Sequence, residues 1–432
     1  MLNTAALLTD RYELTMLQTS RHAGTADRRC VFEVFTRHLP AGRRYGVVAG
    51  TGRLLELLKD FRFDSSTLDW LRSEKVVDDQ TLDWLANYKF SGNISGYREG
   101  EIYFANSPVL TVESTFAEAI LLETLILSIF NFDSSVASAA SRMVSAADGR
   151  FLAEMGSRRV SEHGAVAAAR AAYIAGFDAT SNLEAGRSWG IATMGTSAHS
   201  FILLHDSEEQ AFKAQLETFG EQTTLLVDTF DIETAVRKAI SLAPNLGAVR
   251  LDSGDLAVEV NRVRALLDSL GASKTKITVT NDLDEFSIAA LAAAPVDAYG
   301  VGTSVATGSG APTAGFVYKL VSFEGSDGQW QSVAKKSSQK TNVGGRKNAV
   351  RRVNAQGVAT AEVIASETQV VHDANDRELT VNFVRAGQVN PEFMGKSGTA
   401  LARAHHKVAK AELPIQALRL VRGDAAIATE FI

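Results

Sequence analysis

The segment Gly190-Ile-Ala-Thr-Met-Gly-Thr-Ser-Ala-His-Ser200 is a short apolar run followed by a polar turn that carries His199. We predict a buried strand over 190–194, ended by the turn that begins at Gly195, and a helix from about Asp206 to Phe219. A histidine between a strand and a helix can face a ligand while the strand fixes its position. The alternative is a loop histidine that only packs or caps, so the surrounding sequence has to decide between the two.

The same rhythm of strand and helix repeats from about residue 133 to residue 312. Short β-rich runs alternate with Ala-rich helical patterns at about the spacing of one β/α unit, which predicts a parallel sheet. The predicted strands are 176–181, 190–194, 223–227, 248–251, 276–280 and 298–301, and the helices between them include 162–175, 207–219, 232–242, 256–270 and 284–293. Six strands are too few for an eight-stranded barrel, so we expect an incomplete or distorted β/α barrel.

The segments on either side of this region mix short strands with helices. Residues 1–132 predict helices at 9–20, 51–58, 64–88 and 113–132 and strands at 30–36, 90–98 and 108–112, and after residue 312 strands are predicted at 316–323, 361–364 and 381–384. We therefore expect an α/β protein with three segments. Residues 1–132 and 313–432 together form an α+β sandwich module, and residues 133–312 form the barrel that carries the active site.

Composition excludes several classes of function. The chain has 432 residues, 45% of them hydrophobic and 22% charged, with a formal net charge of −6, so binding to nucleic acid or an anionic membrane through bulk charge is not expected. Cys30 is the only cysteine, which excludes an internal disulfide and a cysteine metal site. The first residues lack a basic region, and the apolar segment 116–132 is too short to span a bilayer. We expect a cytoplasmic protein.

A polar residue or a glycine stands at or just after the carboxyl end of each predicted strand. In chain order these are Thr180 and Ser181, His199 in its loop, Asp228, Asp252, Asp282, and Gly302 with Thr303. The carboxyl ends of the strands carry the active site of a β/α barrel. Any one of the aspartates could instead cap the following helix. Several acids at equivalent positions beside a histidine favour an enzyme over a binding module.

Three groups of residues in this region suit anion binding. Arg158 and Arg159 precede a helix, where the helix dipole does not favour positive charge. They either bind a phosphate or carboxylate ligand or are simply a solvated pair of arginines. The run 300–304 has two glycines and two hydroxyls that can form a phosphate nest. Strand alternation puts Arg250 and Asp252 on one face, either to serve a ligand or to form an internal ion pair.

His199 and Asp228 are expected on neighbouring strands. A carboxylate that accepts the N–H of one imidazole nitrogen leaves the other nitrogen free as a nucleophile. This pairing suits phosphoryl transfer onto histidine and also general-base catalysis, and the residues alone leave both open.

With these residues in hand, the chain resembles the nicotinate phosphoribosyltransferases. The motifs, in the order of that family, are Thr9-Asp-Arg-Tyr-Glu-Leu-Thr-Met16, Arg170-Ala-Ala-Tyr-Ile-Ala-Gly-Phe-Asp-Ala-Thr-Ser-Asn182, Gly195-Thr-Ser-Ala-His-Ser200, Arg250-Leu-Asp-Ser-Gly-Asp255 and Tyr299-Gly-Val-Gly-Thr303. The resemblance implies that nicotinate and phosphoribosyl pyrophosphate give nicotinate mononucleotide and pyrophosphate, coupled to ATP hydrolysis, with Mg²⁺. It also implies a homodimer in which the segment that carries Tyr12 reaches the neighbouring site.

The resemblance further implies a role for each candidate residue. His199 is phosphorylated by ATP, and Asp228 supports it. Asp252, which we count with them as catalytic, matches a group around the phosphoribosyl moiety and pyrophosphate. The substrates are bound by Tyr12, which stacks on the pyridine ring, by Ser181 and Arg250 at its carboxylate, by Arg158 at the phosphoribosyl group and pyrophosphate, by Gly302 and Thr303 at the 5′-phosphate, and by Thr180 and Asp282. Ser181 favours nicotinate, because the related nicotinamide enzyme carries an acid near that position.

The sequence departs from the family pattern at two positions. Met155 stands where a phenylalanine often sandwiches the ring, and Ala179 stands where glycine is common. The basic run 335–352 is similar to a family segment and is expected to be a structural or phosphate-adjacent loop, with nucleic-acid binding as the alternative. Other functions remain open: an ATP-independent transferase of the quinolinate or nicotinamide type, and a catalytically silent ligand-binding regulator.

Overall fold

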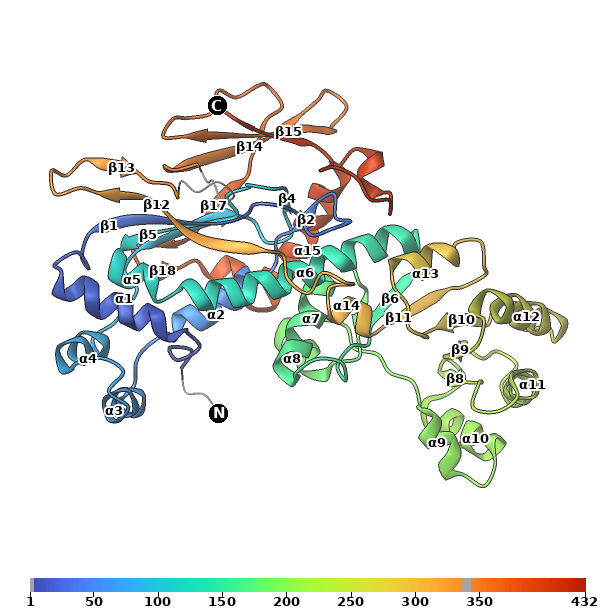
Figure 1. Ribbon diagram of the computed structural model, residues 1–432. Helices are drawn as coiled ribbons and strands as arrows, with labels where there is room; N and C mark the ends of the chain where they lie inside the picture. The colour runs from blue at the N-terminus through green and yellow to red at the C-terminus, as the bar shows by residue number, and fades with distance from the viewer. Residues whose placement is uncertain (1–3, 336–342) are drawn as a thin grey trace. The chain divides into compact units, whose positions relative to one another are not determined.

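The computed structural model describes residues 4–335 and 343–432 and contains two compact units (Figure 1). The first unit combines Met1–Ser138 with Ala311–Ile432, and the second is Ala139–Gly310. From the sequence we placed these divisions after residues 132 and 312. None of the helices in the described residues is long and apolar enough to cross a membrane.

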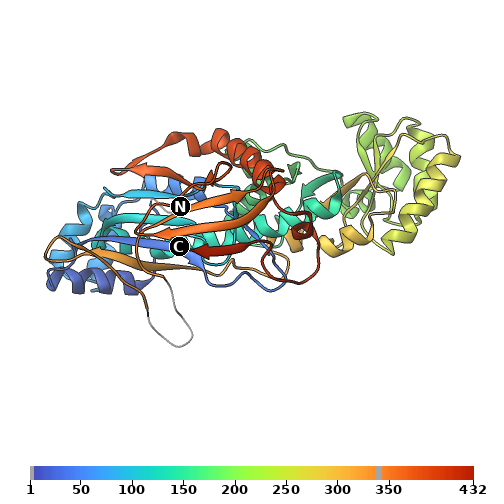
Figure 2. The ribbon, with the colours of Figure 1, turned by 90° about the horizontal axis from the view of Figure 1, so that it is seen from above.

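The first unit is built around a sheet that takes strands from both ends of the chain (Figure 1, Figure 2). Its order in the described residues is β13 (Trp330–Ser332), β12 (Phe316–Glu324), β1 (Arg29–Thr36), β5 (Leu110–Thr115), β3 (Asn93–Tyr97), β17 (Thr380–Arg385) and β18 (Gln388–Val389). The blue strand β1 pairs antiparallel with the orange strand β12 on one side and with β5 on the other. This sheet confirms that the C-terminal segment returns to the N-terminal module.

Apolar residues explain the central place of β1. Every residue of β1 except Arg29 is buried, so both faces of the strand are covered. Phe32 stacks on Tyr318 of β12 with ring centroids 4.7 Å apart, and Val34 lies opposite Leu110 of β5. The helices of this unit are α1 (Arg11–His22), α2 (Thr51–Lys59), α3 (Ser65–Ser73), α4 (Asp79–Ala86), α5 (Phe116–Ile120), the first part of α6 (Glu123–Ala147), α15 (Gly395–Ala411), and the 3₁₀ turns η1 (Pro391–Phe393) and η2 (Ile415–Leu418).

Two smaller sheets complete the first unit. One has the order β16 (Arg377–Glu378), β14 (Lys347–Val353), β15 (Ala359–Ser366) and β19 (Ala428–Phe431), and the other pairs β2 (Gly46–Val47) with β4 (Ile102–Tyr103). Strand β14 corrects our prediction of a loop for part of the basic run. Its Ala349 and Val350 are buried, and its basic side chains are neutralised by acids within the unit. Residues 336–342 of that run lie outside the described residues.

The acids that neutralise the basic run come from distant segments. Buried Lys347 lies 2.7 Å from a carboxylate oxygen of Glu33, and buried Arg351 lies 3.0 Å from a carboxylate oxygen of Glu362. These pairs favour a structural role for 346–352 over the nucleic-acid alternative, because paired and buried cations are not available to phosphates.

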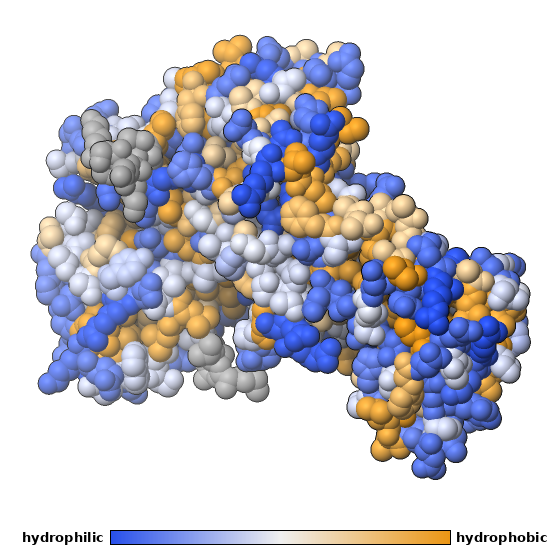
Figure 3. Space-filling model, turned by 45° about the vertical axis from the view of Figure 1, so that its right-hand side comes forward, coloured by the Kyte–Doolittle hydropathy of each residue, from blue (hydrophilic) through white to orange (hydrophobic). Residues whose placement is uncertain are grey.

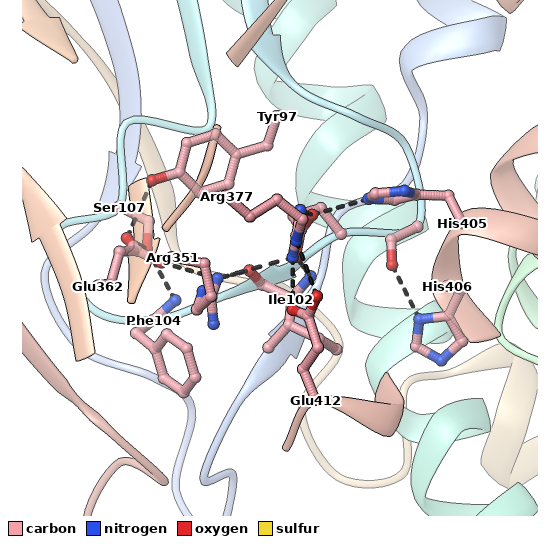
Figure 4. A network of polar contacts seen from close by, with 12 residues as sticks. Tyr97, Ile102, Phe104, Ser107, Arg351, Glu362, Arg377, His405, His406 and Glu412 are labelled. Atoms are coloured by element: carbon pink, nitrogen blue, oxygen red, sulfur yellow. Dashed lines mark hydrogen bonds and ion pairs between the residues drawn. The ribbon is translucent and has the colours of Figure 1, made fainter. Parts of the chain in front are cut away.

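A buried polar network joins β14 and β15 to the segment before β4 and to α15 (Figure 4). Glu101 accepts hydrogen bonds from Arg377 and from Nε2 of His405, each at 2.7 Å. Burial alone would raise the pKa of Glu101, but the hydrogen bonds from His405 and Arg377 and the charge of Arg351 hold it well below the usual range. Glu101 is therefore an ionised carboxylate inside the first unit.

The second unit contains an open, parallel sheet. Within residues 139–310, all of which are described, its order is β7 (Ala179–Thr180), β6 (Phe151–Glu154), β11 (Ala298–Val301), β10 (Lys276–Val279), β9 (Ala248–Leu251) and β8 (Thr224–Leu226). The helices between the strands are α7 (Glu162–Ile174), α8 (Leu183–Trp189), α9 (His199–Leu204), α10 (Glu208–Phe219), α11 (Ile232–Leu242), α12 (Leu256–Ser269), α13 (Glu285–Ala290) and α14 (Thr303–Ala306). Strands β7 and β8 are edges of this sheet, which confirms an incomplete β/α barrel.

The strands of this sheet differ from the prediction in two places. The segment 190–194 is not a strand: Gly190 ends α8 in the left-handed conformation, with φ +72°, and only Thr193 forms a bridge, to Thr180. Strand β6 was not predicted, because its sequence Phe-Leu-Ala-Glu has no β-branched residue and begins with an exposed Phe151. The sixth strand of the sheet is therefore Phe151–Glu154 in place of 190–194.

Three predicted helices also differ from the structure. The single helix expected over 64–88 is two helices, α3 and α4. The helix expected over 113–132 is preceded by β5, which extends to Thr115, and is split into α5 and α6. The single helix expected from about Asp206 is α10, and an additional short helix, α9, begins at His199 itself.

Candidate active site

The three aspartates that follow β8, β9 and β10 do not cap the next helices. The N-caps of α11, α12 and α13 are Asp231, Asp255 and Asp284, each of which accepts a hydrogen bond from a backbone N–H of the first turn. Asp228, Asp252 and Asp282 lie two or three residues earlier, between each strand and its cap. The capping alternative is therefore wrong for all three, and their carboxylates remain for other work at this edge of the sheet.

His199 is held at this edge by a threonine. Its Nδ1 lies 3.0 Å from Oγ1 of Thr229, and its Nε2 lies 3.7 Å from a carboxylate oxygen of Asp252. The side chain of His199 is 41% exposed, so a ligand can reach the ring. We expected Asp228 to accept the imidazole N–H, but the structure gives this contact to the next residue. Strand β8 ends at Leu226, so strand alternation does not determine which of the two side chains faces the histidine.

Asp228 contacts the neighbouring turn. One carboxylate oxygen accepts hydrogen bonds from the backbone N–H of Asp252 and from Oγ of Ser253, both at 2.7 Å. The other carboxylate oxygen is buried and has no hydrogen-bond partner among the described residues. Asp228 is therefore bonded to the turn that carries Asp252, the residue whose carboxylate lies near His199.

Arg250 ties the His199 loop to the strand ends. Its guanidinium donates to Oγ1 of Thr196 at 2.6 Å and to the carbonyl oxygen of Ser197 at 3.1 Å. It also donates to Oγ1 of Thr280 at 2.9 Å and lies 3.2 Å from a carboxylate oxygen of Asp252. The side chain of Arg250 is 14% exposed. The internal ion pair that we gave as the alternative is thus present.

Exposed apolar side chains lie on the two helices that follow this loop. Leu203, Leu204 and Phe219 are exposed on α9 and α10, and Figure 3 shows orange apolar groups among blue ones in the lower part of the view, where these helices lie. A hollow of about 820 Å³ opens beside the loop, between Gly195–Ser197 and the residues that lead from α10 to β8. The loop that carries His199 is therefore accessible in this unit.

Two further candidates, Thr180 and Ser181, lie at the end of β7, next to the end of β6. Ser181 is partly exposed, but Thr180 is fully buried and its hydroxyl donates to the carboxylate of Glu154 at 2.6 Å. The Thr180 hydroxyl, which we expected at a substrate, is thus bound to the protein. Glu154 was not among the predicted residues, because β6 itself was not predicted.

Glycines make room at the end of β11. A Cβ on Gly300 would lie 2.6 Å from Cγ2 of Thr280 and 2.7 Å from Sδ of Met155. Only glycine therefore lets Met155 lie across this strand. Gly302 precedes the short helix α14, and Thr303, its first residue, is exposed.

The remaining candidates, Arg158, Asp282 and Tyr12, are exposed to solvent. Arg158 and Asp282 are exposed, and within the described residues neither forms an ion pair. Asp282 has a φ of +37°, an uncommon conformation for a residue other than glycine. Tyr12 belongs to the first unit, on α1, where partial burial and the charge of Glu123 raise its pKa to about 12.

Sequence reasoning missed Thr229, Thr280 and Glu154. Thr229 directly follows a predicted aspartate and Thr280 ends a predicted strand, so a search for hydroxyls at strand ends would have found both. Among the described residues, no group of three or more His, Cys, Asp or Glu side chains is arranged to hold a metal ion.

An open parallel barrel whose carboxyl edge gathers a histidine, an arginine and two aspartates is the framework of an α/β enzyme. Residues 7–131 match the nicotinate phosphoribosyltransferase (NAPRTase) N-terminal domain, and residues 151–379 match the nicotinate phosphoribosyltransferase (NAPRTase) family. The chain belongs to the nicotinate phosphoribosyltransferase family.

Individual relatives are similar over most of the chain. Nicotinate phosphoribosyltransferase pncB1 of Mycobacterium tuberculosis is 53% identical over 441 residues, which cover 99% of this chain and 95% of the relative. Nicotinate phosphoribosyltransferase of Bacillus subtilis is 36% identical over 82% of this chain and 74% of its own length. The crystal structure of human nicotinic acid phosphoribosyltransferase has the same fold, with a TM-score of 0.83 and 24% identity over 98% of this chain and 97% of the human chain.

Proposed function

We propose that the protein is a nicotinate phosphoribosyltransferase that couples its reaction to ATP through a phosphohistidine at position 199. Nicotinate, phosphoribosyl pyrophosphate, ATP and water give nicotinate mononucleotide, pyrophosphate, ADP and phosphate, a step of NAD salvage. Identity to named enzymes over the whole chain supports the transferase activity. The observation that carries the ATP coupling is the setting of His199, whose Nδ1 is bound to Thr229 while Nε2 faces Asp252.

This setting favours Nε2 as the phosphate acceptor. When Nδ1 carries the proton and donates it to the Thr229 hydroxyl, the lone pair of Nε2 is free for attack on the γ-phosphorus of ATP. A bond from Nε2 to phosphorus forms, the bond to the leaving oxygen breaks, and ADP departs. Water later cleaves the phosphohistidine and releases phosphate. Asp228 and Arg250 support this step by fixing Asp252 and the histidine loop.

The remaining candidates suit the transfer itself. Ser181 and Arg250 supply a hydroxyl and a cation for the nicotinate carboxylate, and Tyr12 supplies a ring for stacking. Arg158 is an exposed cation suited to pyrophosphate, on which negative charge builds as the ribose takes on oxocarbenium character. Gly302 and Thr303 offer backbone N–H groups and a hydroxyl for the 5′-phosphate.

Mg²⁺ fits this edge of the sheet as an ion that arrives with the substrates. It usually keeps several waters and takes one or two carboxylates together with substrate phosphates, so a cluster of three protein ligands is not required. Asp252 and Asp282 are the carboxylates that would hold it. When bound, the ion would neutralise phosphate charge.

A homodimer with shared sites and a cytoplasmic location belong to the same proposal. Both follow from the family resemblance, and the first predicts that Tyr12 serves the site of the neighbouring copy. Light scattering tests the dimer, and a fully active monomer would contradict it.

The decisive experiment incubates the full chain with ATP labelled at the γ-phosphate and measures acid-labile, base-stable label on the protein. We expect label on the wild type and none on His199→Ala. His205→Ala is the matched control, because His205 ends the same short helix and its Nδ1 contacts only the carbonyl oxygen of Phe201. Label that persists in His199→Ala would overturn the phosphohistidine.

Substrate choice is a separate test. Steady-state assays should show strong preference for nicotinate over nicotinamide, because Ser181 has no carboxylate with which to accept an amide N–H₂. Equal use of the two substrates would refute this assignment. An ATP-independent transferase is the second candidate, and full turnover of nicotinate or quinolinate without ATP would establish it.

A further inference from the structure

We propose that Glu154 is a positioning residue whose carboxylate fixes the turn that carries Arg158 against the turn that carries Ser181. The inference rests on the proposed function, because those two residues are the expected contacts of the pyrophosphate and of the nicotinate carboxylate. Glu154 itself touches neither substrate.

Glu154 is placed between the two turns by the sheet. It is the last residue of β6, and β6 pairs in parallel with β7, with Glu154 opposite Thr180. Its two carboxylate oxygens accept from different turns: one from the backbone N–H of Gly156, and the other from the hydroxyl of Thr180 at 2.6 Å. The backbone carbonyl of Glu154 accepts the N–H of Ser181 at 2.8 Å.

Further hydrogen bonds extend this link across both turns. Oγ1 of Thr180 accepts the backbone N–H of Asn182 at 3.0 Å, and the side-chain amide of Asn182 donates to Oγ of Ser157, also at 3.0 Å. A closed chain of polar contacts therefore runs from Glu154 through Thr180 and Asn182 to the residue before Arg158. The two turns cannot shift independently without breaking it.

The link is also rigid, because it is buried and tightly packed. Glu154 is 1% exposed, and Thr180 is fully buried. A Cβ on Gly156 would lie 2.5 Å from Cβ of Ala306 and 2.8 Å from a carboxylate oxygen of Glu154, so only glycine brings this N–H so close. Within the described residues Glu154 pairs with no cation, and its partners are neutral donors. This arrangement suits a fixed acceptor better than a group that binds charge.

The consequence for the reaction is alignment. The pyridine nitrogen has to approach C1 of the ribose in line with the departing pyrophosphate. The distance between Ser181, which contacts nicotinate, and Arg158, which contacts pyrophosphate, must therefore stay constant. A buried acceptor shared by both turns provides that constraint. Loss of the acceptor should impair the binding of both substrates and leave the chemistry at His199 intact.

The test uses three variants of the full chain and one control. Glu154→Gln keeps the size of the side chain but replaces one acceptor oxygen by an amide, Thr180→Val removes the hydroxyl, and Thr180→Ser restores it. Glu285→Gln is the control, because Glu285 is also 1% exposed in the same unit but pairs with Arg142, at 3.0 Å, and accepts from the hydroxyl of Ser309. The measurements are KM and kcat for each substrate, the affinity for phosphoribosyl pyrophosphate by calorimetry, label from γ-labelled ATP, and the melting temperature.

We expect KM for both phosphoribosyl pyrophosphate and nicotinate to rise about tenfold or more in Glu154→Gln and in Thr180→Val, since displaced binding groups lose alignment. Thr180→Ser should return to within about twofold of the wild type, since it keeps the hydroxyl donor. Glu285→Gln should lower the melting temperature without moving either KM. Label on His199 should be retained in all four variants.

Several outcomes overturn the inference. It fails if KM for both substrates is unchanged in Glu154→Gln, if Thr180→Ser is as impaired as Thr180→Val, or if Glu285→Gln raises KM equally. If Glu154→Gln does not fold, the two Thr180 variants decide. If the wild type lacks nicotinate turnover, the proposed function fails, while calorimetry with phosphoribosyl pyrophosphate still reports on the two turns.

Discussion

Oγ1 of Thr229 lies 3.0 Å from Nδ1 of His199. A hydroxyl can accept the N–H of Nδ1, so this contact can orient the imidazole ring and favour the tautomer in which Nε2 carries the lone pair. A nucleophilic nitrogen has to be unprotonated, and this contact suits that requirement.

Thr229→Val should therefore slow phosphorylation of His199 by about fivefold, the effect of one lost orienting hydrogen bond of about 1 kcal/mol. Rapid-quench labelling with γ-labelled ATP measures the rate. The affinity for nicotinate should remain within about twofold, because the threonine lies at the ring and not at the pyridine site. Thr229→Ser is the control and should label normally, and equal loss in the two variants would contradict the orienting role.

Asp228→Asn should slow labelling more than it weakens nicotinate binding. Both donors reach the same carboxylate oxygen of Asp228 at 2.7 Å. Asparagine therefore either keeps the two contacts without their charge, or turns its amide nitrogen toward both donors and releases the turn of Asp252. We expect about tenfold slower labelling, as for one lost charge-assisted hydrogen bond. Asp231→Asn is the matched control on the same loop, since asparagine also caps helices well. Weaker nicotinate binding with normal labelling would refute this account.

Arg250→Gln should impair both partial reactions. Arg250 holds Thr196 and Ser197 of the histidine loop and is also the proposed cation for nicotinate. Labelling and nicotinate affinity should each fall about tenfold or more, as expected for hydrogen bonds to a charged group. Hydrogen exchange over 195–199 should rise in this variant and not in Arg237→Gln, which removes an exposed arginine of α11. Unchanged exchange would show that the loop does not depend on Arg250.

Glu101 should make the first unit acid-sensitive. Its pKa is depressed in the folded protein, so the unfolded chain binds the proton more readily and stability rises with pH. The contribution is complete above the ordinary glutamate pKa of 4.5 and is lost as the pH falls below it. Glu101→Gln should cost about 3–5 kcal/mol at pH 7, because Arg377 and His405 lose a buried partner.

Urea unfolding followed by tryptophan fluorescence between pH 7 and pH 3 measures this dependence. The difference in stability between wild type and Glu101→Gln should shrink as the pH falls. A difference that stays constant over this range would contradict the assignment. Glu217→Gln is the control, because Glu217 is an exposed acid of α10.

The sequence predicted elements well where apolar runs were bounded by turns. Residues 248–251 and 298–301 are strands β9 and β11 with the predicted bounds. The segment 190–194 has a similar apolar character, but it follows directly on α8, and Gly190 is used to end that helix. Local composition does not reveal this competition, and it also does not reveal β6, whose four residues include none that is β-branched.

The sequence predicted which edge of the parallel sheet carries the site, but it did not predict which side chains contact one another there. Strand ends indicate which residues gather, because parallel strands share one carboxyl edge. Strand ends do not fix the direction of the side chains that follow the last residue of the strand. For this reason the sequence did not show that Thr229, and not Asp228, contacts His199. The link from Glu154 to Thr180 joins residues whose strands pair side by side, and that pairing is set by the whole sheet.

The central position of β1 has a consequence for biosynthesis. One edge of β1 is completed by β5, which leaves the ribosome soon afterwards, but the other edge waits for β12, after the whole second unit has been made. The parallel sheet of the second unit comes from one continuous stretch and has no such delay. We expect the nascent chain to expose the apolar edge of β1 during this interval. A chaperone that binds the nascent chain would therefore cover this strand until β12 has been made.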